Sequence, residues 1–158
     1  MVIISNILTY LEIATESLAE SERLSALYWK SNQNGTAGHI SSIDPNQQSF
    51  KHALIAIAFA AAYLEALLHI EGYRRLGAEV YEKIDRQTYR MKMEALGIDD
   101  PVLLEASDHF RAARKDLFHE KPIKESRDPN SVMRIAQSEA RSAIEFVKSV
   151  SNHFQSHA

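Results

Sequence analysis

The sequence predicts an all-α protein that folds as one domain, an up-and-down bundle of four to five helices. Proline and glycine are scarce, with four and five residues among 158. They fall between long stretches whose apolar residues recur with a period near 3.6, which is typical of helices. No stretch alternates apolar and polar residues as a half-buried strand does. Residues 1–158 are therefore expected to form a single helical domain without internal repeats.

The first two helices are expected over residues 5–29 and 47–70. Between them, residues 30–49 read KSNQNGTAGHISSIDPNQQS, a polar stretch that predicts a long loop. The second helix is apolar on nearly all sides, which places it against several neighbours. Its alanine-rich middle, AFAAAY, permits close approach of another helix.

Proline and glycine mark the ends of the later helices. A third helix is expected over residues 78–95 and ends at LGIDDP, where Gly97 is the predicted C-cap glycine. Asp100 and Pro101 predict the N-cap and first residue of a fourth helix that runs to about residue 119. Pro122 cannot continue that helix. A last helix is expected from DPNSV, at residues 128–132, to about residue 154.

Composition favours a soluble protein of a reducing compartment. The chain has no cysteine, which excludes disulfides, thiolate catalysis and cysteine metal sites and fits the cytoplasm. The N-terminal stretch lacks a basic region and a cleavage site, so we expect no signal peptide. The most apolar run, residues 53–68, is 16 residues long and contains Glu65. A membrane span needs about 20 apolar residues, so we expect a buried helix and no membrane.

Positive charge gathers in one place. The chain carries a net charge of −3, but residues 111–127 hold six basic and three acidic residues. The basic side chains are Arg111, Arg114, Lys115, Lys121, Lys124 and Arg127. This distribution indicates either a solvated helix face or a site for an anionic partner.

The same region contains the stretch RKDLFHEKP, residues 114–122, with four residues between Arg114 and His119 at the predicted helix end. RNA cleavage without a metal needs proton transfers and stabilisation of charge on a phosphate. Histidine can act as acid or base near neutral pH, and the planar arginine fork matches phosphate oxygens. A helix C-terminus favours the protonated form of histidine, which suits a general acid better than a base. The alternative is a basic helix terminus in which His119 acts as a cap.

A helical bundle with Arg, four to six residues and His at the end of the penultimate long helix resembles the HEPN superfamily. The alanine-spaced last helix, SEARSAIEFVKSV, agrees. The resemblance implies a metal-independent endoribonuclease of toxin or defence type, often paired with a nucleotidyltransferase antitoxin. It implies Arg114 as the phosphate-binding residue and His119 as the acid/base, at a cleft between two protomers.

One position departs from the family pattern. The residue after the arginine is often asparagine in active members, and here it is Lys115. Members with altered motifs resemble non-catalytic modules that bind RNA, a nucleotide or a protein partner. Such a module is the alternative function, and a generic helical interaction protein is a third.

The spacing of the motif bears on oligomeric state. On an ideal helix, Arg114 and His119 lie about 140° apart around the axis and about 7.5 Å apart along it. One regular helix therefore does not direct both at the same atom. Either a distorted helix end brings the two side chains together, or a twofold axis places the motif of one protomer against that of another. With a twofold axis, the enzyme hypothesis requires a homodimer.

Two histidines raise a metal hypothesis. Glu65 and His69, and Glu105 and His109, are each spaced i,i+4 and share a helix face. The Glu-x-x-His pattern of di-iron bundles is missing, and no phosphate-binding glycine loop occurs, so we expect no metal and no cofactor. Glu65 lies within an apolar helix and needs a polar partner. We expect it to face the cleft of Arg114 and His119, where Arg111, Lys115, Lys121 and Glu65 would bind substrate.

Overall fold

The computed structural model describes residues 6–32, 45–118 and 129–157, and these form helices without any strand. The helices are α1 (Ile7–Asn32), the 3₁₀ turn η1 (Pro45–Gln47), α2 (Gln48–Leu76), α3 (Ala78–Ile84), α4 (Tyr89–Ala95), α5 (Pro101–Phe118) and α6 (Pro129–Ser156). The predicted all-α class is confirmed.

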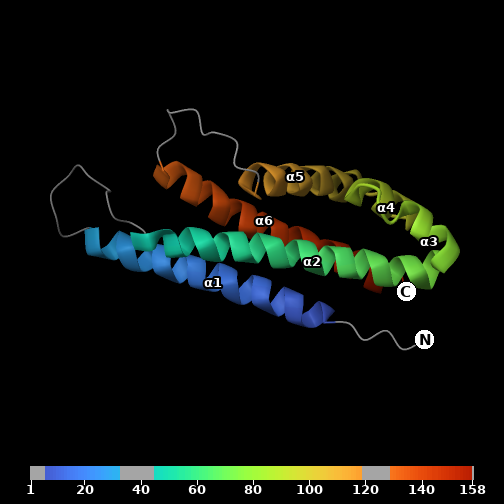
Figure 1. Ribbon diagram of the computed structural model, residues 1–158, viewed down its shortest axis with the longest axis horizontal. Coiled ribbons are helices and arrows are strands. Elements are labelled where there is room, and N and C mark those ends of the chain that lie inside the picture. The colour runs from blue at the N-terminus through green and yellow to red at the C-terminus, as the bar shows by residue number, and fades with distance from the viewer. Residues whose placement is uncertain (1–5, 33–44, 119–128, 158) are drawn as a thin grey trace.

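Four long helices make the bundle. Figure 1 shows α1, α2, α5 and α6 lying along one another, each running opposite to the long helix before it in the chain. α2 is central and packs against both α1 and α6. The short helices α3 and α4 lead from the end of α2 to the start of α5, and α4 packs against α5. The predicted helical bundle is therefore confirmed, with two short helices added to the four long ones.

Small side chains allow the central helices to approach closely. Alanines recur at three- and four-residue spacing on α2 and α6, and they are almost completely buried: Ala53, Ala56, Ala60 and Ala61 on α2, and Ala136, Ala140 and Ala143 on α6. Larger apolar residues such as Leu64, Leu68 and Val147 fill the remaining space and have no exposed surface. Native-like packing density in such a core makes it sensitive to changes in side-chain volume.

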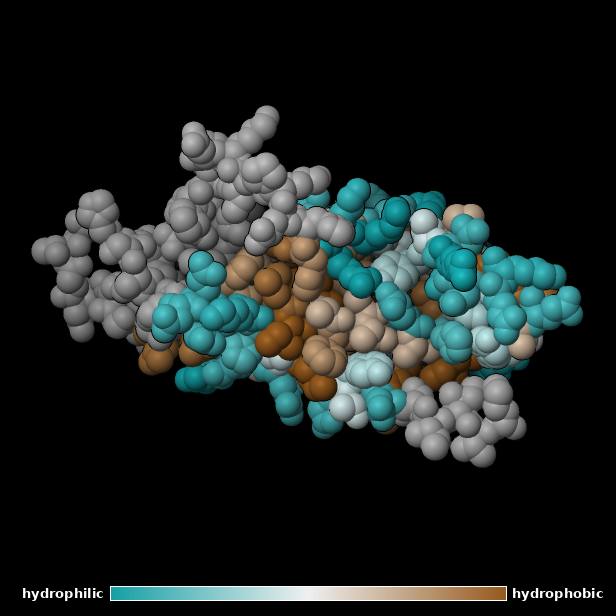
Figure 2. Space-filling view, in the orientation of Figure 1, coloured by the Kyte–Doolittle hydropathy of each residue, from teal (hydrophilic) through white to brown (hydrophobic). Residues whose placement is uncertain are grey.

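α2 is the one helix in the described part of the chain that is long and apolar enough to cross a membrane. Half of its most apolar window is buried inside the bundle. Figure 2 shows hydrophobic residues gathered along the middle of one face, over α2 and the helices beside it. The polar residues on the same face lie mainly over α3 to α5 and over one end of α1.

The end of α2 corrects one prediction. The helix continues six residues beyond the expected residue 70 and ends at Leu76, followed by Gly77 with φ 78°. Arg74 and Arg75 are thus part of its last turn. Both pair with Glu71, at 2.6 and 2.8 Å, and the Arg75 guanidinium lies over the Phe154 ring of α6. The contacts of the two arginines therefore stabilise the last turn of α2 and attach it to α6.

The single helix predicted over residues 78–95 is wrong. The structure has two seven-residue helices, α3 and α4, separated by a turn at residues 85–88. The Thr88 backbone is extended, and its side-chain oxygen accepts a hydrogen bond from Met91 N at 3.3 Å, which caps α4. Threonine commonly starts helices in this way. No glycine or proline marks this turn in the sequence.

The helix boundary at residues 97–101 agrees with the prediction. Gly97 has φ 87°, a conformation that favours glycine at a helix C-terminus. Asp100 Oδ1 accepts a hydrogen bond from Val102 N at 2.9 Å, and Pro101 is the first residue of α5. Residues 1–5, 33–44, 119–128 and 158 lie outside the described part, and so does most of the predicted 30–49 loop.

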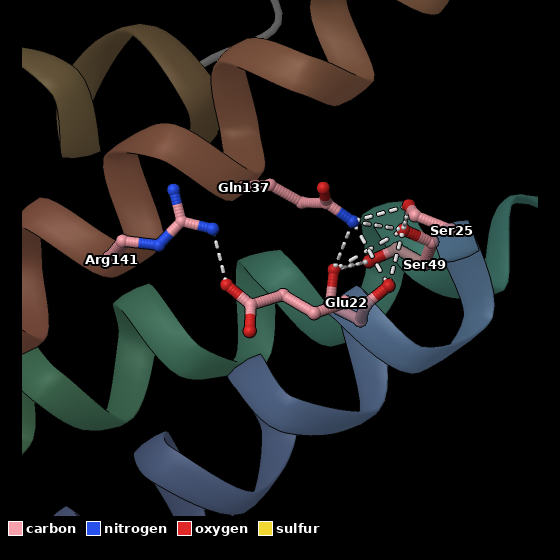
Figure 3. A network of polar contacts seen from close by, with 6 residues as sticks. Glu22, Ser25, Ser49, Gln137 and Arg141 are labelled. Atoms are coloured by element: carbon pink, nitrogen blue, oxygen red, sulfur yellow. Dashed lines mark hydrogen bonds and ion pairs between the residues drawn. The ribbon is translucent and has the colours of Figure 1, made fainter. Parts of the chain in front are cut away.

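A polar cluster, of which Ser21 and Ser49 are buried and the rest partly buried, joins three helices. Gln137 of α6 donates from Nε2 to the hydroxyls of Ser21 and Ser25 on α1 and of Ser49 on α2 (Figure 3). The Ser21 hydroxyl also donates to the Ser49 carbonyl at 2.7 Å. Beside this cluster, Arg141 pairs with Glu22 at the surface. Because buried polar groups need partners, these contacts fix how α6 sits on α1 and α2.

Candidate functional site

A cleft of about 770 Å³ lies among α2, the turn after α3, α4 and α5. Pockets for small ligands commonly measure about 300–1,000 Å³. Most of the side chains that line it are polar or charged: Glu65, Ala66, His69, Ile70, Asp85, Gln87, Thr88, Tyr89, Lys92, Arg111 and Arg114.

One end of the cleft is built around Arg114. Its Nη1 donates to Glu65 Oε1 at 3.0 Å and to the Tyr89 hydroxyl. The Tyr89 hydroxyl in turn donates to the same Glu65 oxygen at 2.7 Å. Residues from α5, α2 and α4 thus form a closed set of three contacts. The expected proximity of Glu65 to Arg114 is present in the structure.

Tyr89 contributes a neutral hydroxyl to this set. Burial raises the pKa of Tyr89 well above its usual value, and the Glu65 carboxylate raises it further, against a smaller lowering by Arg114. At neutral pH the hydroxyl therefore keeps its proton for the hydrogen bond to Glu65. The oxygen remains available to accept from Arg114.

Packing fixes the position of Tyr89. Its ring stacks on Phe110 of α5, with ring centres 5.9 Å apart, and Phe110 contacts Phe146 of α6 at 5.6 Å. On the neighbouring position of α4, Arg90 donates to Asp108 of α5 at 2.7 Å. α4 is therefore attached to α5 by both an aromatic stack and an ion pair. These two contacts orient the Tyr89 hydroxyl towards the cleft.

The other end of the cleft contains His69, one turn after Glu65 on α2. Its ring contacts the Tyr73 ring at a tilt of 37°, with centres 4.5 Å apart, and meets the Tyr81 ring edge-on at 5.5 Å. His69 Nδ1 lies 4.0 Å from Asp85 Oδ1. The same Asp85 oxygen accepts a hydrogen bond from Lys92 Nζ at 3.2 Å.

Asp85 is held in its charged form. Burial alone would raise the pKa of the Asp85 carboxyl, but the adjacent Lys92 ammonium outweighs burial and lowers the pKa below its ordinary value. A negative charge therefore faces His69 from the turn between α3 and α4.

Of the six residues predicted for the site, the cleft brings together Glu65, Arg111 and Arg114. Arg111 precedes Arg114 by one turn on the same face of α5. Lys115 is exposed and does not line the cleft. The predicted positions His119 and Lys121 lie outside the described residues.

The two histidine pairs considered for metal binding do not converge. Glu65 and His69 line the main cleft, whereas Glu105 and His109 line a separate pocket of about 360 Å³ between α5 and α6. In that pocket, His109 Nε2 lies 2.9 Å from Glu139 Oε2. Residues 6–32, 45–118 and 129–157 contain no group of three or more side chains that could hold a metal ion.

Sequence reasoning missed Tyr89, Asp85 and Lys92 as cleft residues. Their places depend on the turn at residues 85–88, which the sequence does not mark with a glycine or proline. The only local signal was Thr88, a residue that caps helices well but also occurs within them. No family model, curated protein or solved structure matches this chain.

Proposed function

We propose that the cleft binds the sugar–phosphate backbone of a single-stranded RNA and that the protein is a HEPN-like, metal-independent endoribonuclease. Arg114 and His119 are the catalytic pair in this proposal. The observation that carries it is the placement of Arg114: the arginine of the sequence motif faces a cleft, is oriented by Glu65 and Tyr89, and has Arg111 one turn away.

The contacts of Arg114 suit phosphate binding. Glu65 and Tyr89 engage Nη1, and the other guanidinium nitrogens have no hydrogen-bond partner among the described residues. A guanidinium fixed at one nitrogen can direct the rest of its planar fork at phosphate oxygens. Three cations line the cleft (Lys92, Arg111 and Arg114) against two carboxylates (Glu65 and Asp85), so its balance favours an anion.

The motif supplies the remaining chemistry. In the sequence, His119 directly follows Phe118, the last residue of α5, and it lies outside the described residues. In the proposed reaction, His119 transfers a proton while Arg114 stabilises the charge that develops on the phosphate. Neither role requires a metal ion.

The resemblance that suggested the activity also suggests its setting. In this proposal the protein acts in the cytoplasm as a homodimer whose two motifs face one another. It belongs to a toxin or defence system, and a nucleotidyltransferase antitoxin would restrain it. A homodimer would also resolve the angular separation of Arg114 and His119 on one helix.

Cleavage of total and transfer RNA in EDTA tests the proposal. The wild-type protein is compared with Arg114→Ala, His119→Ala and the matched control Arg74→Ala, which removes an exposed arginine on α2 that pairs with Glu71. We expect cleavage by the wild type and the control and a loss of at least about 100-fold in the other two variants.

Other outcomes distinguish the alternatives. RNA binding without cleavage by the wild type would favour the non-catalytic module. Cleavage that survives both motif substitutions would refute the assigned pair. The absence of both binding and cleavage would refute an RNA function.

A further inference from the structure

We infer that the end of the cleft around His69 is a nucleobase subsite: a base of the bound RNA lies against the His69 ring, and Asp85 and Gln87 select guanine by its edge. The inference rests on one part of the proposed function, that RNA lies in the cleft, and deepens it by naming the base that is recognised. Every residue that it uses belongs to the described part of the chain.

His69 is the aromatic side chain against which the cleft can hold a base. Two aromatic rings line the cleft, those of His69 and Tyr89. Tyr89 is buried and its ring stacks on Phe110, so little of it is open to a ligand. The His69 side chain is 50 % exposed. Because proteins that bind single-stranded RNA stack its bases on aromatic side chains, histidine included, His69 is the expected partner of a base.

The surrounding side chains hold the His69 ring in place for such a contact. The rings of Tyr73 and Tyr81 both contact it. Tyr81 is completely buried, and its own ring lies directly over Gly72. A side chain that is already oriented loses little conformational freedom when a ligand binds, which favours affinity.

The spacing along α2 leaves room for a sugar between a bound phosphate and a bound base. His69 lies one turn after Glu65, a step of about 6 Å along the helix, and Glu65 contacts Arg114 at 3.0 Å. In a nucleotide the sugar separates the base from the phosphate. A phosphate held by Arg114 and Arg111 therefore allows the sugar and base to extend along α2 as far as His69.

The polar groups beside His69 favour a base that donates hydrogen bonds. Asp85 Oδ1 lies 4.0 Å from His69 Nδ1, and the Asp85 side chain is 47 % exposed. Burial raises the pKa of Asp85, but the adjacent Lys92 ammonium outweighs burial and lowers it, so at neutral pH the carboxylate acts only as an acceptor. Gln87, in the same turn, lines the cleft with an amide that can donate as well as accept.

Guanine matches these two side chains best. Its edge presents two adjacent donors, N1–H and the N2 amino group, beside the O6 acceptor. The Asp85 carboxylate can accept from both donors at once, and the Gln87 amide can donate to O6. Uracil has one donor between two acceptors that a carboxylate repels, while adenine and cytosine offer one amino group each. Since a bidentate contact discriminates strongly between bases, we expect a preference for guanine of about 5-fold to 100-fold.

Binding of short RNAs tests the inference. The probes are a short fluorescent oligouridine and the same chain with one guanosine, adenosine or cytidine at its centre. Each is 2′-O-methylated, so that attack by a 2′-oxygen is blocked. Fluorescence anisotropy in EDTA gives the Kd for the wild type, His69→Ala, His69→Phe, Asp85→Asn and Arg114→Ala. The control is His109→Ala, which changes an exposed histidine at the second pocket.

We expect His69→Ala to weaken binding of the guanosine-containing RNA by about 5-fold to 100-fold, whereas His69→Phe, which keeps a ring, should retain most of the affinity. Asp85→Asn should lose most of the preference for guanosine, because an amide cannot accept from both guanine donors in this way. Arg114→Ala should weaken all four RNAs by a similar factor, since a phosphate contact does not depend on the base. His109→Ala should bind as the wild type does.

Two results would overturn the inference, and they differ in what they say about the proposed function. If the wild type binds RNA and Arg114→Ala weakens binding, but the wild type shows no preference for guanosine or His69→Ala binds equally well, the subsite is refuted and RNA binding in the cleft stands. If the wild type binds none of the RNAs, the proposed function fails and the inference fails with it. Circular dichroism identifies a variant that does not fold, and His69→Phe then decides the role of the ring.

A competition experiment separates RNA from a free nucleotide as the source of the base. Guanosine monophosphate should displace the guanosine-containing RNA only at concentrations at least about tenfold above the Kd of that RNA, because it lacks the neighbouring phosphates. Equal affinity for the mononucleotide would refute RNA as the ligand of the subsite.

Discussion

The Tyr89 hydroxyl connects the two charged groups at one end of the cleft, because it donates to Glu65 and accepts from Arg114. It can do so only while it keeps its proton. Tyr81 is the second tyrosine whose pKa depends on burial: its side chain is completely buried, and the nearby Asp85 carboxylate adds to the rise in pKa that burial causes. Loss of the proton from either hydroxyl at alkaline pH should therefore destabilise the fold.

Stability should fall above pH 10, the ordinary tyrosine pKa, because burial raises the pKa of Tyr81 and Tyr89 in the folded protein. Above pH 10 the unfolded chain releases these protons while the folded chain retains them, so stability that is complete below pH 10 is lost as pH rises. Urea denaturation from pH 8 to 11 measures this. Tyr81→Phe should reduce the slope, because it removes one of the two hydroxyls whose pKa differs between the folded and the unfolded chain. An unchanged slope in Tyr81→Phe would contradict the account.

At the scale of elements, the contact between α2 and α3 decides where one wall of the cleft stands. Gly72 of α2 lies directly under the Tyr81 ring of α3, and a Cβ at residue 72 would lie 2.1 Å from Tyr81 Cδ2. No side chain fits there. This close approach holds α3, and the turn that carries Asp85, against α2.

Gly72→Ala should lower the free energy of unfolding by about 1–3 kcal/mol, because the added methyl group overpacks the contact with Tyr81. In a Tyr81→Ala background the same change should be neutral or should stabilise the protein by up to about 1 kcal/mol, the helix preference of alanine over glycine. Urea denaturation of the four proteins gives the coupling. Equal effects in both backgrounds would show that the Tyr81 ring does not limit residue 72.

The same elements show what could be predicted from the sequence. The boundary at Gly97, Asp100 and Pro101 was predictable because each residue has a local preference that the structure satisfies. The turn at residues 85–88 was not, because its apolar residues keep a helical spacing across it. What breaks the helix is tertiary: Lys92 of α4 pairs with Asp85, and Tyr81 fits over Gly72.

At the scale of the whole molecule, the cluster of Gln137, Ser21, Ser25 and Ser49 sets how α6 lies on the first two helices (Figure 3). Alanine surfaces alone allow neighbouring registers, because their side chains are alike in size. A partly buried amide that meets three hydroxyls favours one register, since a shift would leave the buried hydroxyls of Ser21 and Ser49 with fewer partners.

Gln137→Leu should therefore lower the free energy of unfolding by about 1–3 kcal/mol, because it leaves buried hydroxyls with fewer partners at nearly constant volume. Arg141→Ala is the matched control one turn further along α6. It removes an exposed ion pair with Glu22 and should cost at most about 1 kcal/mol. Thermal or urea denaturation measures both, and a greater loss in Arg141→Ala would contradict the role of the cluster.

The candidate site was predictable only in part, because it too depends on tertiary contacts between helices. The motif identified Arg114, and the need of a carboxylate within an apolar helix for a partner identified Glu65. The sequence indicated His69 only as a candidate metal ligand, because it is spaced i,i+4 from Glu65. The cleft that unites these residues with Tyr89, Asp85 and Lys92 depends on how α4 folds back onto α5, and a single sequence does not contain that information.

The proposed function requires that RNA occupies the cleft among α2, α4 and α5. The most direct test is the change in backbone amide NMR signals when a short single-stranded RNA is added to the His119→Ala variant, which should bind the RNA without cutting it. If RNA binds in this cleft, the changes should concentrate at residues 65–73, 85–92 and 111–118. Changes confined to α1 and the far side of α6, or no change at all, would contradict it.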